Sequence, residues 1–238
     1  MKVKSAVITL VPIYLVILGL VLLVAAAGSR SVTAYSENAI TDNRRCIIID
    51  AGHGGVDGGA TSCTGVLESG INLEISLRLE DLFQLLGMKT VMIRKTDCSV
   101  YTEGETIAAK KVSDLKNRVN TINNTNDAVL ISIHQNYFSD SRYSGAQVFY
   151  AKEEGSAELA RRLQTAFVST LNPESNRKAK KSSGVYLMDN ITCPGVLIEC
   201  GFLSNAHEEH LLRDAEYQKK ICCVIVSVCN QYLYGIAS

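Results

Sequence analysis

Short apolar runs rich in β-branched residues alternate along most of this chain with segments whose apolar residues recur at helical spacing. The first pattern predicts buried strands and the second predicts amphipathic helices. Strands are expected at residues 46–50, 88–93, 128–133, 147–151, 184–188 and 195–198. Helices are expected at residues 70–86, about 115–122, 159–167 and 217–234. This alternation predicts an α/β single domain with a mostly parallel, twisted central sheet flanked by helices.

The amino-terminal part of the chain differs from this pattern. Lys2 and Lys4 precede an uncharged, mainly apolar segment, residues 5–28, whose length is close to the roughly 20 residues that cross a bilayer. Positive charge before such a segment favours an amino terminus inside and a remainder outside. Its length favours an uncleaved anchor in residues 1–28. Residues 32–34, Val-Thr-Ala, also offer a cleavage site for a removed signal peptide, and a buried core helix is a third alternative.

A single catalytic domain is expected after this segment. Residues 29–43 are polar and aperiodic, which predicts a linker, and the domain is placed at residues 44–238. Two of the chain's 24 basic residues lie before position 29, so the rest carries 22 basic and 24 acidic residues, a net charge near −2. No nucleic acid partner is expected, because such a partner requires a basic face. The eight cysteines lack zinc-finger spacing and are interpreted as buried free thiols, with disulfides as the alternative.

Side chains that bind or activate a metal-bound water follow three of the predicted strands. His53, His134 and Glu199 each come where a short apolar run ends. Because the carboxyl ends of parallel strands meet at one edge of a sheet, these three residues are expected together. Glu68 is a fourth candidate, directly before a predicted helix. Two imidazoles and a carboxylate, with one position left for water, are typical of a catalytic zinc site.

Two other segments resemble binding motifs less well. The glycine-rich turn at residues 50–60 presents His53, but it has neither the GxGxxG nor the GxxxxGK[ST] spacing of a phosphate-binding loop. His207 and His210 lie three residues apart, not four as in HExxH. The charged residues around them predict a solvated polar helix and not a metal site.

Residues 172–183 form the one strongly basic, loop-like stretch. Arg177, Lys178, Lys180 and Lys181 lie close together within it. Such a stretch is ordinarily a solvated loop. A loop that overhangs the strand ends can also hold a substrate that bears carboxylates, and both interpretations stay open here.

Several motifs occur in a fixed order along the chain. They are DAGHGG at 50–55, Glu68 with Asn72, Arg94 with Asp97, SIHQN at 132–136, and Glu199 with Gly201 and Phe202. Together they resemble the zinc-dependent N-acetylmuramoyl-L-alanine amidases of the third amidase family over about residues 44–235. Ala51 stands where the family usually has Pro, and Ser69-Gly70 where it usually has Lys-Asp. Neither difference changes a ligand candidate.

The resemblance implies one Zn²⁺ bound by His53, Glu68 and His134, with Glu199 as the catalytic carboxylate. The implied substrate is peptidoglycan, cut at the amide between N-acetylmuramic acid and L-alanine of the stem peptide. Chemistry supports these roles, because zinc acidifies its bound water and an unligated carboxylate can take up the proton. Two alternatives are a zinc peptidase that cuts within the stem peptide and a catalytically idle wall-binding protein.

The short chain, its apolar amino-terminal segment and its RKAKK stretch further resemble the membrane-anchored, germination-specific amidases. That subgroup acts in sporulation and germination, where it prepares muramic-δ-lactam in spore cortex. The resemblance implies a membrane-anchored hydrolase with its catalytic domain on the extracytoplasmic side, including the spore intermembrane space, or a secreted one if the segment is cleaved. The sequence identifies neither an activating protein partner nor an oligomeric state.

Overall fold

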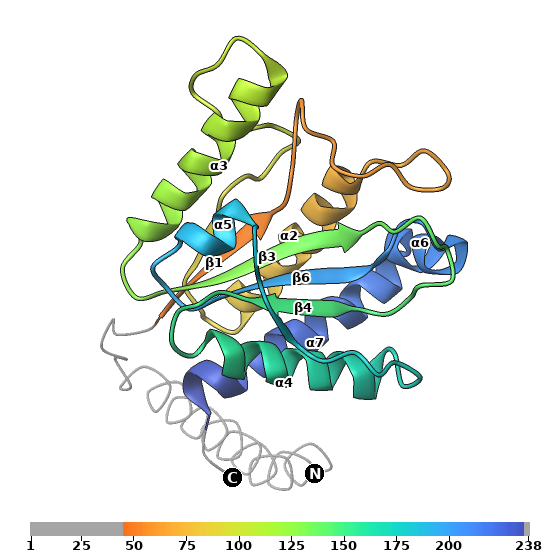
Figure 1. Cartoon of the computed structure of the whole chain (residues 1–238). Coiled ribbons are helices and arrows are strands. Elements are labelled where there is room, and N and C mark those ends of the chain that lie inside the picture. Colours follow the sequence, from red (N-terminus) through yellow and green to blue (C-terminus); the bar gives the residue numbers. More distant parts are fainter. Residues whose placement is uncertain (1–44, 236–238) are drawn as a thin grey trace, which may run out of the picture. The chain divides into compact units, whose positions relative to one another are not determined.

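The computed structural model describes residues 45–235, which contain a six-stranded mixed sheet between two layers of helices (Figure 1). The strands are β1 (Cys46–Ala51), β2 (Thr90–Met92), β3 (Ala128–Asn136), β4 (Gln147–Tyr150), β5 (Lys180–Lys181) and β6 (Gly195–Phe202). The helices are α2 (Glu68–Leu85), α3 (Ile107–Asn123), α4 (Ser156–Thr170), α5 (Tyr186–Asn190), α6 (Ala206–Arg213) and α7 (Ala215–Tyr234). The strand order is β2-β1-β3-β6-β4-β5.

The direction of β4 sets the layout of the sheet. Four of the five strand pairs are parallel, and β4 alone runs antiparallel to its neighbour β6. The predicted α/β fold with a mostly parallel sheet is therefore confirmed, with β4 and its parallel neighbour β5, which run opposite to the other four strands, as the exception. The loop from β3 to β4 stays at one edge of the sheet, because an antiparallel strand needs no crossover helix. The start of β4, Gln147, therefore lies opposite Glu199, near the edge where the parallel strands end.

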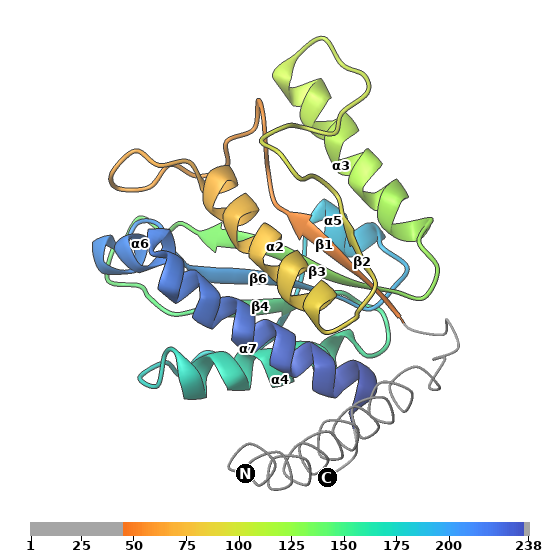
Figure 2. The same cartoon turned by 180° about the vertical axis from the view of Figure 1, so that it is seen from behind.

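Both faces of the sheet are covered by helices. Figure 2 shows α2, α4 and α7 on one face, and Figure 1 shows α3 and α5 on the other. Side chains of a strand alternate between faces. Ile47 and Ile49 therefore pack in the core beneath α2, α4 and α7, and Ile48 packs in the core beneath α3 and α5. Burial on both faces explains why the central strands read as continuous apolar runs and not as alternating ones.

One predicted element is wrong. Residues 184–188 do not form a strand, because α5 occupies residues 186–190. Gly184 has a φ of 75°, and its N–H donates to the side chain of Asp189, which fixes the start of the helix. Leu187 and Met188 are both buried in the core under α3, whereas neighbours in a strand would face opposite sides. A short apolar run does not distinguish a strand from a buried helical turn.

The remaining differences concern element ends and cysteines. Lys180 and Lys181 pair with β4 as a short strand within the stretch that was expected to be a loop. All eight cysteines are free thiols, four of them buried as interpreted, but Cys63, Cys98 and Cys223 are exposed. The predicted anchor and linker, residues 1–43, lie outside the described residues. Within residues 45–235, no helix combines the length and the apolar character that a bilayer crossing requires.

Candidate metal centre

His53 is presented by the turn that follows β1. It has a left-handed φ of 60°, a conformation that costs energy in a residue with a side chain. Arg118 helps to hold this turn, because its guanidinium donates to the His53 carbonyl at 2.7 Å. Gly52 provides the space beside it. A Cβ atom at position 52 would lie 2.3 Å from the imidazole of His134, so the two histidines approach only because this residue is glycine.

Glu68 is the first residue of α2 and is buried. Its Oε2 accepts a hydrogen bond from the Ala60 N–H at 2.9 Å. Its Oε1 accepts from the side chain of Asn72 and from the Gln135 N–H, both at 3.1 Å. These bonds fix the carboxylate between the turn after β1 and strand β3.

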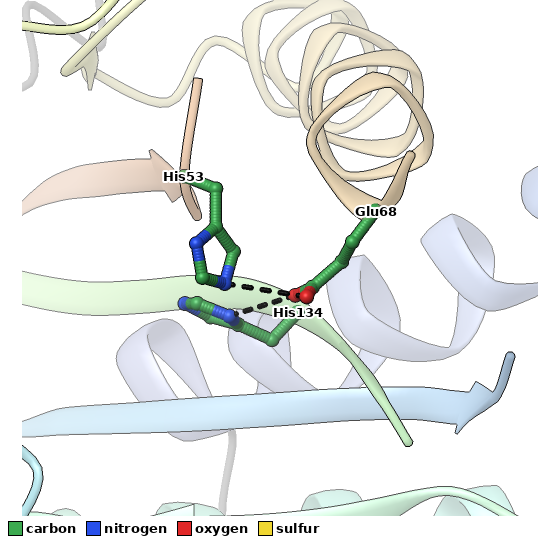
Figure 3. A group of neighbouring side chains, drawn as sticks. All are labelled: His53, Glu68 and His134. Atoms are coloured by element: carbon green, nitrogen blue, oxygen red, sulfur yellow. Dashed lines mark hydrogen bonds and ion pairs between the residues drawn. The ribbon is translucent and has the colours of Figure 1, made fainter. Parts of the chain in front are cut away.

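The side chains of His53, Glu68 and His134 converge on one point (Figure 3). His53 Nε2 lies 3.2 Å from Glu68 Oε2, and His134 Nδ1 lies 3.0 Å from Glu68 Oε1. One ligand atom from each residue lies within 4.8 Å of the others. Tetrahedral zinc with bonds of about 2.0–2.1 Å places its ligand atoms roughly 3.3 Å apart. The donor set and its spacing therefore fit a zinc ion.

The electrostatics of this cluster favour a bound cation. Burial alone raises the pKa of Glu68, but the hydrogen bonds and charges of His134 and His53 lower it well below its usual range. Burial lowers the pKa of His53, and the carboxylates of Glu68 and Asp57 outweigh it, so the net pKa is raised. The carboxylates thus stabilise positive charge at this point, which a metal ion supplies as well as a proton does.

Asp57 orients His53 from behind. Its Oδ2 lies 2.9 Å from His53 Nδ1 and 3.0 Å from the Lys111 ammonium. A carboxylate on the outer imidazole nitrogen fixes the tautomer, and this arrangement leaves Nε2 for a metal. Asp57 was not among the candidate residues predicted from the sequence. Its signal was a carboxylate four residues after His53 in the same glycine-rich turn.

Glu199 lies on β6, directly opposite His134 on β3. Its Oε2 is buried and has no hydrogen-bond partner among the described residues. Burial, with a smaller contribution from Glu68, raises the pKa of Glu199 to about 7, while His134 and His53 oppose the shift. The predicted gathering of the four residues is thus found, although β3 and β6 extend past His134 and Glu199 and these residues do not lie beyond the strand ends.

Two buried arginines hold the backbone around the cluster. Arg94 donates to the carbonyls of Ala51, Gly52 and Ser69 at 2.8–3.0 Å. Arg118 donates to Asp50 at 2.5 Å and to the Ala51 carbonyl at 3.0 Å. Arg94 belongs to a motif found in the sequence, whereas Arg118 was missed, because nothing in a helical segment marks one arginine as inward-facing.

The prediction of a solvated helix around His207 and His210 is wrong for the two acids between them. Both histidines are exposed, but Glu208 and Glu209 are buried. Glu208 accepts from the N–H groups of Gly145 and Phe202 at 2.8 Å. Glu209 accepts from the hydroxyls of Ser62 and Thr64. These acids tie α6 to loops on both sides of it and contribute no metal ligand.

Comparisons with known proteins agree with this geometry. Residues 47–228 match the family described as N-acetylmuramoyl-L-alanine amidase. The germination-specific N-acetylmuramoyl-L-alanine amidase of Bacillus subtilis is 39% identical over 183 residues, which cover 76% of each chain. The CwlD amidase of Clostridioides difficile, solved in complex with the GerS lipoprotein, superposes with a TM-score of 0.76 at 40% identity, covering 79% of this chain and 98% of that one.

A second solved structure, an N-acetylmuramoyl-L-alanine amidase from Clostridium difficile 630, has a TM-score of 0.70 and 28% identity. The match covers 82% of this chain and all of that one. The family match spans the segments that carry His53, Glu68, His134 and Glu199. The chain therefore belongs to the N-acetylmuramoyl-L-alanine amidase family, in which zinc dependence is typical, and is an amidase that acts on peptidoglycan.

Proposed function

We propose that His53, Glu68 and His134 bind one zinc ion and that Glu199 is the catalytic carboxylate for hydrolysis of the amide between N-acetylmuramic acid and L-alanine. The observation that carries the proposal is the convergence of three donors within 4.8 Å beside a buried carboxylate oxygen that has no partner among the described residues. A buried oxygen in this state is unusual unless a ligand or a water satisfies it.

Each side chain has a separate task in this scheme. Bound zinc acidifies a water and polarises the scissile carbonyl. Asp57 and the hydrogen bonds to Glu68 keep the donors aligned. Glu199 accepts a proton from the attacking water and delivers it to the amine of the leaving L-alanine. Its buried Oε2 has no hydrogen-bond partner among the described residues, so this oxygen is available to take and give a proton.

The germination-specific relative supports a role in spore cortex. Removal of the stem peptide frees the lactyl carboxyl of muramic acid, and this carboxyl is what muramic-δ-lactam formation requires. Residues 1–28 are proposed to anchor the protein with its catalytic domain on the extracytoplasmic side, or to direct its secretion if they are cleaved. The complex of the Clostridioides difficile relative with a lipoprotein supports the proposal that this chain also has a protein partner.

Products of peptidoglycan digestion test the reaction. The zinc-loaded protein should release full-length stem peptides that begin with L-alanine, as read by mass spectrometry. Shortened stems would identify a peptidase, and no release by zinc-loaded protein, alone or with a lipoprotein partner, would identify a wall-binding protein. Glu199→Gln should retain zinc and lose activity by roughly 10² or more, the scale of general acid-base catalysis.

Zinc content tests the ligands separately from turnover. His134→Ala removes one of three donors and should leave the protein largely without zinc, because a three-ligand site does not survive loss of an imidazole. His210→Ala is the matched control, since this histidine is exposed and lies outside the cluster. Full zinc occupancy in His134→Ala would overturn the ligand assignment.

A further inference from the structure

A pocket of about 860 Å³ lies at the same end of the sheet as α6. The loop between β3 and β4, the segment between α4 and β5, and α6 form its walls, and both views of the fold show these segments gathered there (Figures 1 and 2). We call it the basic pocket, after Arg142, Arg177, Lys178 and Lys180 in its lining. It lies apart from the metal centre, because none of the three donors lines it.

Three of the four cations of the basic pocket are available to a ligand, whereas Arg142 is paired with Asp140. Lys178 and Lys180 are exposed and form no ion pair within residues 45–235. Arg177 is held in place, because its Nε donates to the Ser144 carbonyl at 3.0 Å and its guanidinium carbon lies 4.8 Å from the centre of the Phe202 ring. Its two terminal nitrogens have no hydrogen-bond partner among the described residues.

Gln147 adds a buried acceptor to the lining. Its side chain is 1% exposed, and its Nε2 donates to the Lys178 carbonyl at 2.8 Å and to Gln164 at 3.2 Å. Its Oε1 has no partner in the part of the chain that is described. The pocket thus combines free cations with an acceptor that lacks a donor. A peptide end, with an amide N–H and a carboxylate, supplies both counterparts.

The lining also favours a carboxylate over a phosphate. Glu174 and Glu208 line the same pocket. Glu208 is fixed there by the N–H groups of Gly145 and Phe202. These carboxylates oppose a doubly charged phosphate more strongly than a singly charged carboxylate, because like charges repel in proportion to their magnitude.

The reach of the stem peptide connects this pocket to the metal centre. Phe202, which packs under Arg177, is three residues beyond Glu199 on β6. At about 3.3 Å per residue, this separation is roughly 10 Å at most. An extended peptide covers the same distance in about three residues. A stem whose first residue lies at Glu199 and whose chain extends along β6 can therefore reach Arg177 with its fourth residue.

We propose that the basic pocket binds the terminal carboxylate of the stem peptide and so selects substrates by the length and charge of the stem. This inference rests on the proposed amidase function of the metal centre. It also separates Lys181, which does not line the pocket, from its neighbour Lys180. The basic stretch is thus divided into a ligand-facing part and a solvated part.

Kinetics with a matched substrate pair test the proposal. The substrates are a muramoyl tetrapeptide with a free terminal carboxylate and the same compound with that carboxylate amidated. The wild-type KM should be about fivefold lower for the free acid, since two exposed charge contacts contribute modestly. Lys178→Gln/Lys180→Gln should diminish this difference, with Arg177 retained, whereas Lys181→Gln/Lys220→Gln, which removes the same charge elsewhere, should preserve it.

The outcomes distinguish the two proposals. Absence of cleavage of both substrates by the wild-type protein would overturn the amidase role. Cleavage of both with equal KM, or undiminished discrimination by the Lys178/Lys180 variant, would overturn the pocket assignment alone. The preference for the free acid should also weaken with added salt, because exposed charges are screened. Zinc content and circular dichroism confirm that the variants, which change only exposed lysines, remain folded.

Discussion

Arg118 offers the sharpest test of how this fold supports its metal centre. The side chain is buried on α3, and its NH1 lies 2.5 Å from the equally buried carboxylate of Asp50. It also bonds to Asp114 and to the carbonyls of Ala51 and His53. In Arg118→Met these bonds are lost, and among the described residues the Asp50 side chain keeps only the hydroxyl of Ser132 as a hydrogen-bond partner.

The size of the effect follows from the burial of this pair. Removal of one partner of a buried ion pair leaves an uncompensated charge, which costs about 3–5 kcal/mol. An exposed pair contributes at most about 1 kcal/mol. Arg161→Met is therefore the control, because Arg161 pairs with Glu158 on the surface of α4. Since the free energy of unfolding of a domain is about 5–15 kcal/mol, Arg118→Met should remove a large part of it.

Urea unfolding at several pH values measures this prediction. Burial raises the pKa of Asp50, but Arg118, His134 and Ser132 together outweigh it and the net pKa is lowered. A carboxylate with a lowered folded pKa stabilises the fold above its unfolded value of about 3.9 and loses that contribution as the pH falls. The deficit of Arg118→Met should thus be largest near neutral pH and shrink in acid. A loss below 1 kcal/mol at pH 7 would refute this reasoning.

Two further changes act on the donors themselves. Gly52→Ala should displace the His134 ring, because the added Cβ would lie 2.3 Å from it, and zinc content should therefore fall. Gly70→Ala is the matched control, because a Cβ there meets no atom within 4 Å, and its zinc content should stay normal. Asp57→Asn removes the charged partner of His53 and should weaken zinc affinity about 10- to 100-fold, as measured by chelator competition; unchanged affinity would deny Asp57 its orienting role.

The central strands and the convergence of the candidate metal donors could be predicted from the sequence for a physical reason. Strands buried on both faces must be apolar throughout, so runs such as residues 128–133 are easy to recognise. Polar side chains at the ends of these runs indicate the edge of the sheet where the candidate site lies. His53, His134 and Glu199 became candidates in this way, whereas Glu68 was a candidate because it directly precedes a predicted helix. Their partners were harder to find, because Asp57 and Arg118 act through contacts made only when distant segments meet.

The errors have the same origin. Leu187 and Met188 resemble part of a strand in the sequence. Their burial beneath α3 in the structure shows that a helical turn places both side chains in the same core. Glu208 and Glu209 resemble surface residues in the sequence, because a sequence does not show that N–H and hydroxyl groups of distant segments donate hydrogen bonds to them. Local pattern therefore determined the elements, while tertiary partners determined which charged residues are buried.

The antiparallel course of β4 divides the chain by task. All three candidate metal donors come from residues 53–134, whereas the lining of the basic pocket comes from residues 142–217, a range that also contains Glu199 on β6. The two sets share only the edge where β4 begins beside β6. Insertions and substitutions in the loops that line the basic pocket can thus accumulate during evolution without displacing a candidate donor or Glu199. A lineage that meets a cell wall of different composition can retain its hydrolytic machinery and change only the loops that read the peptide.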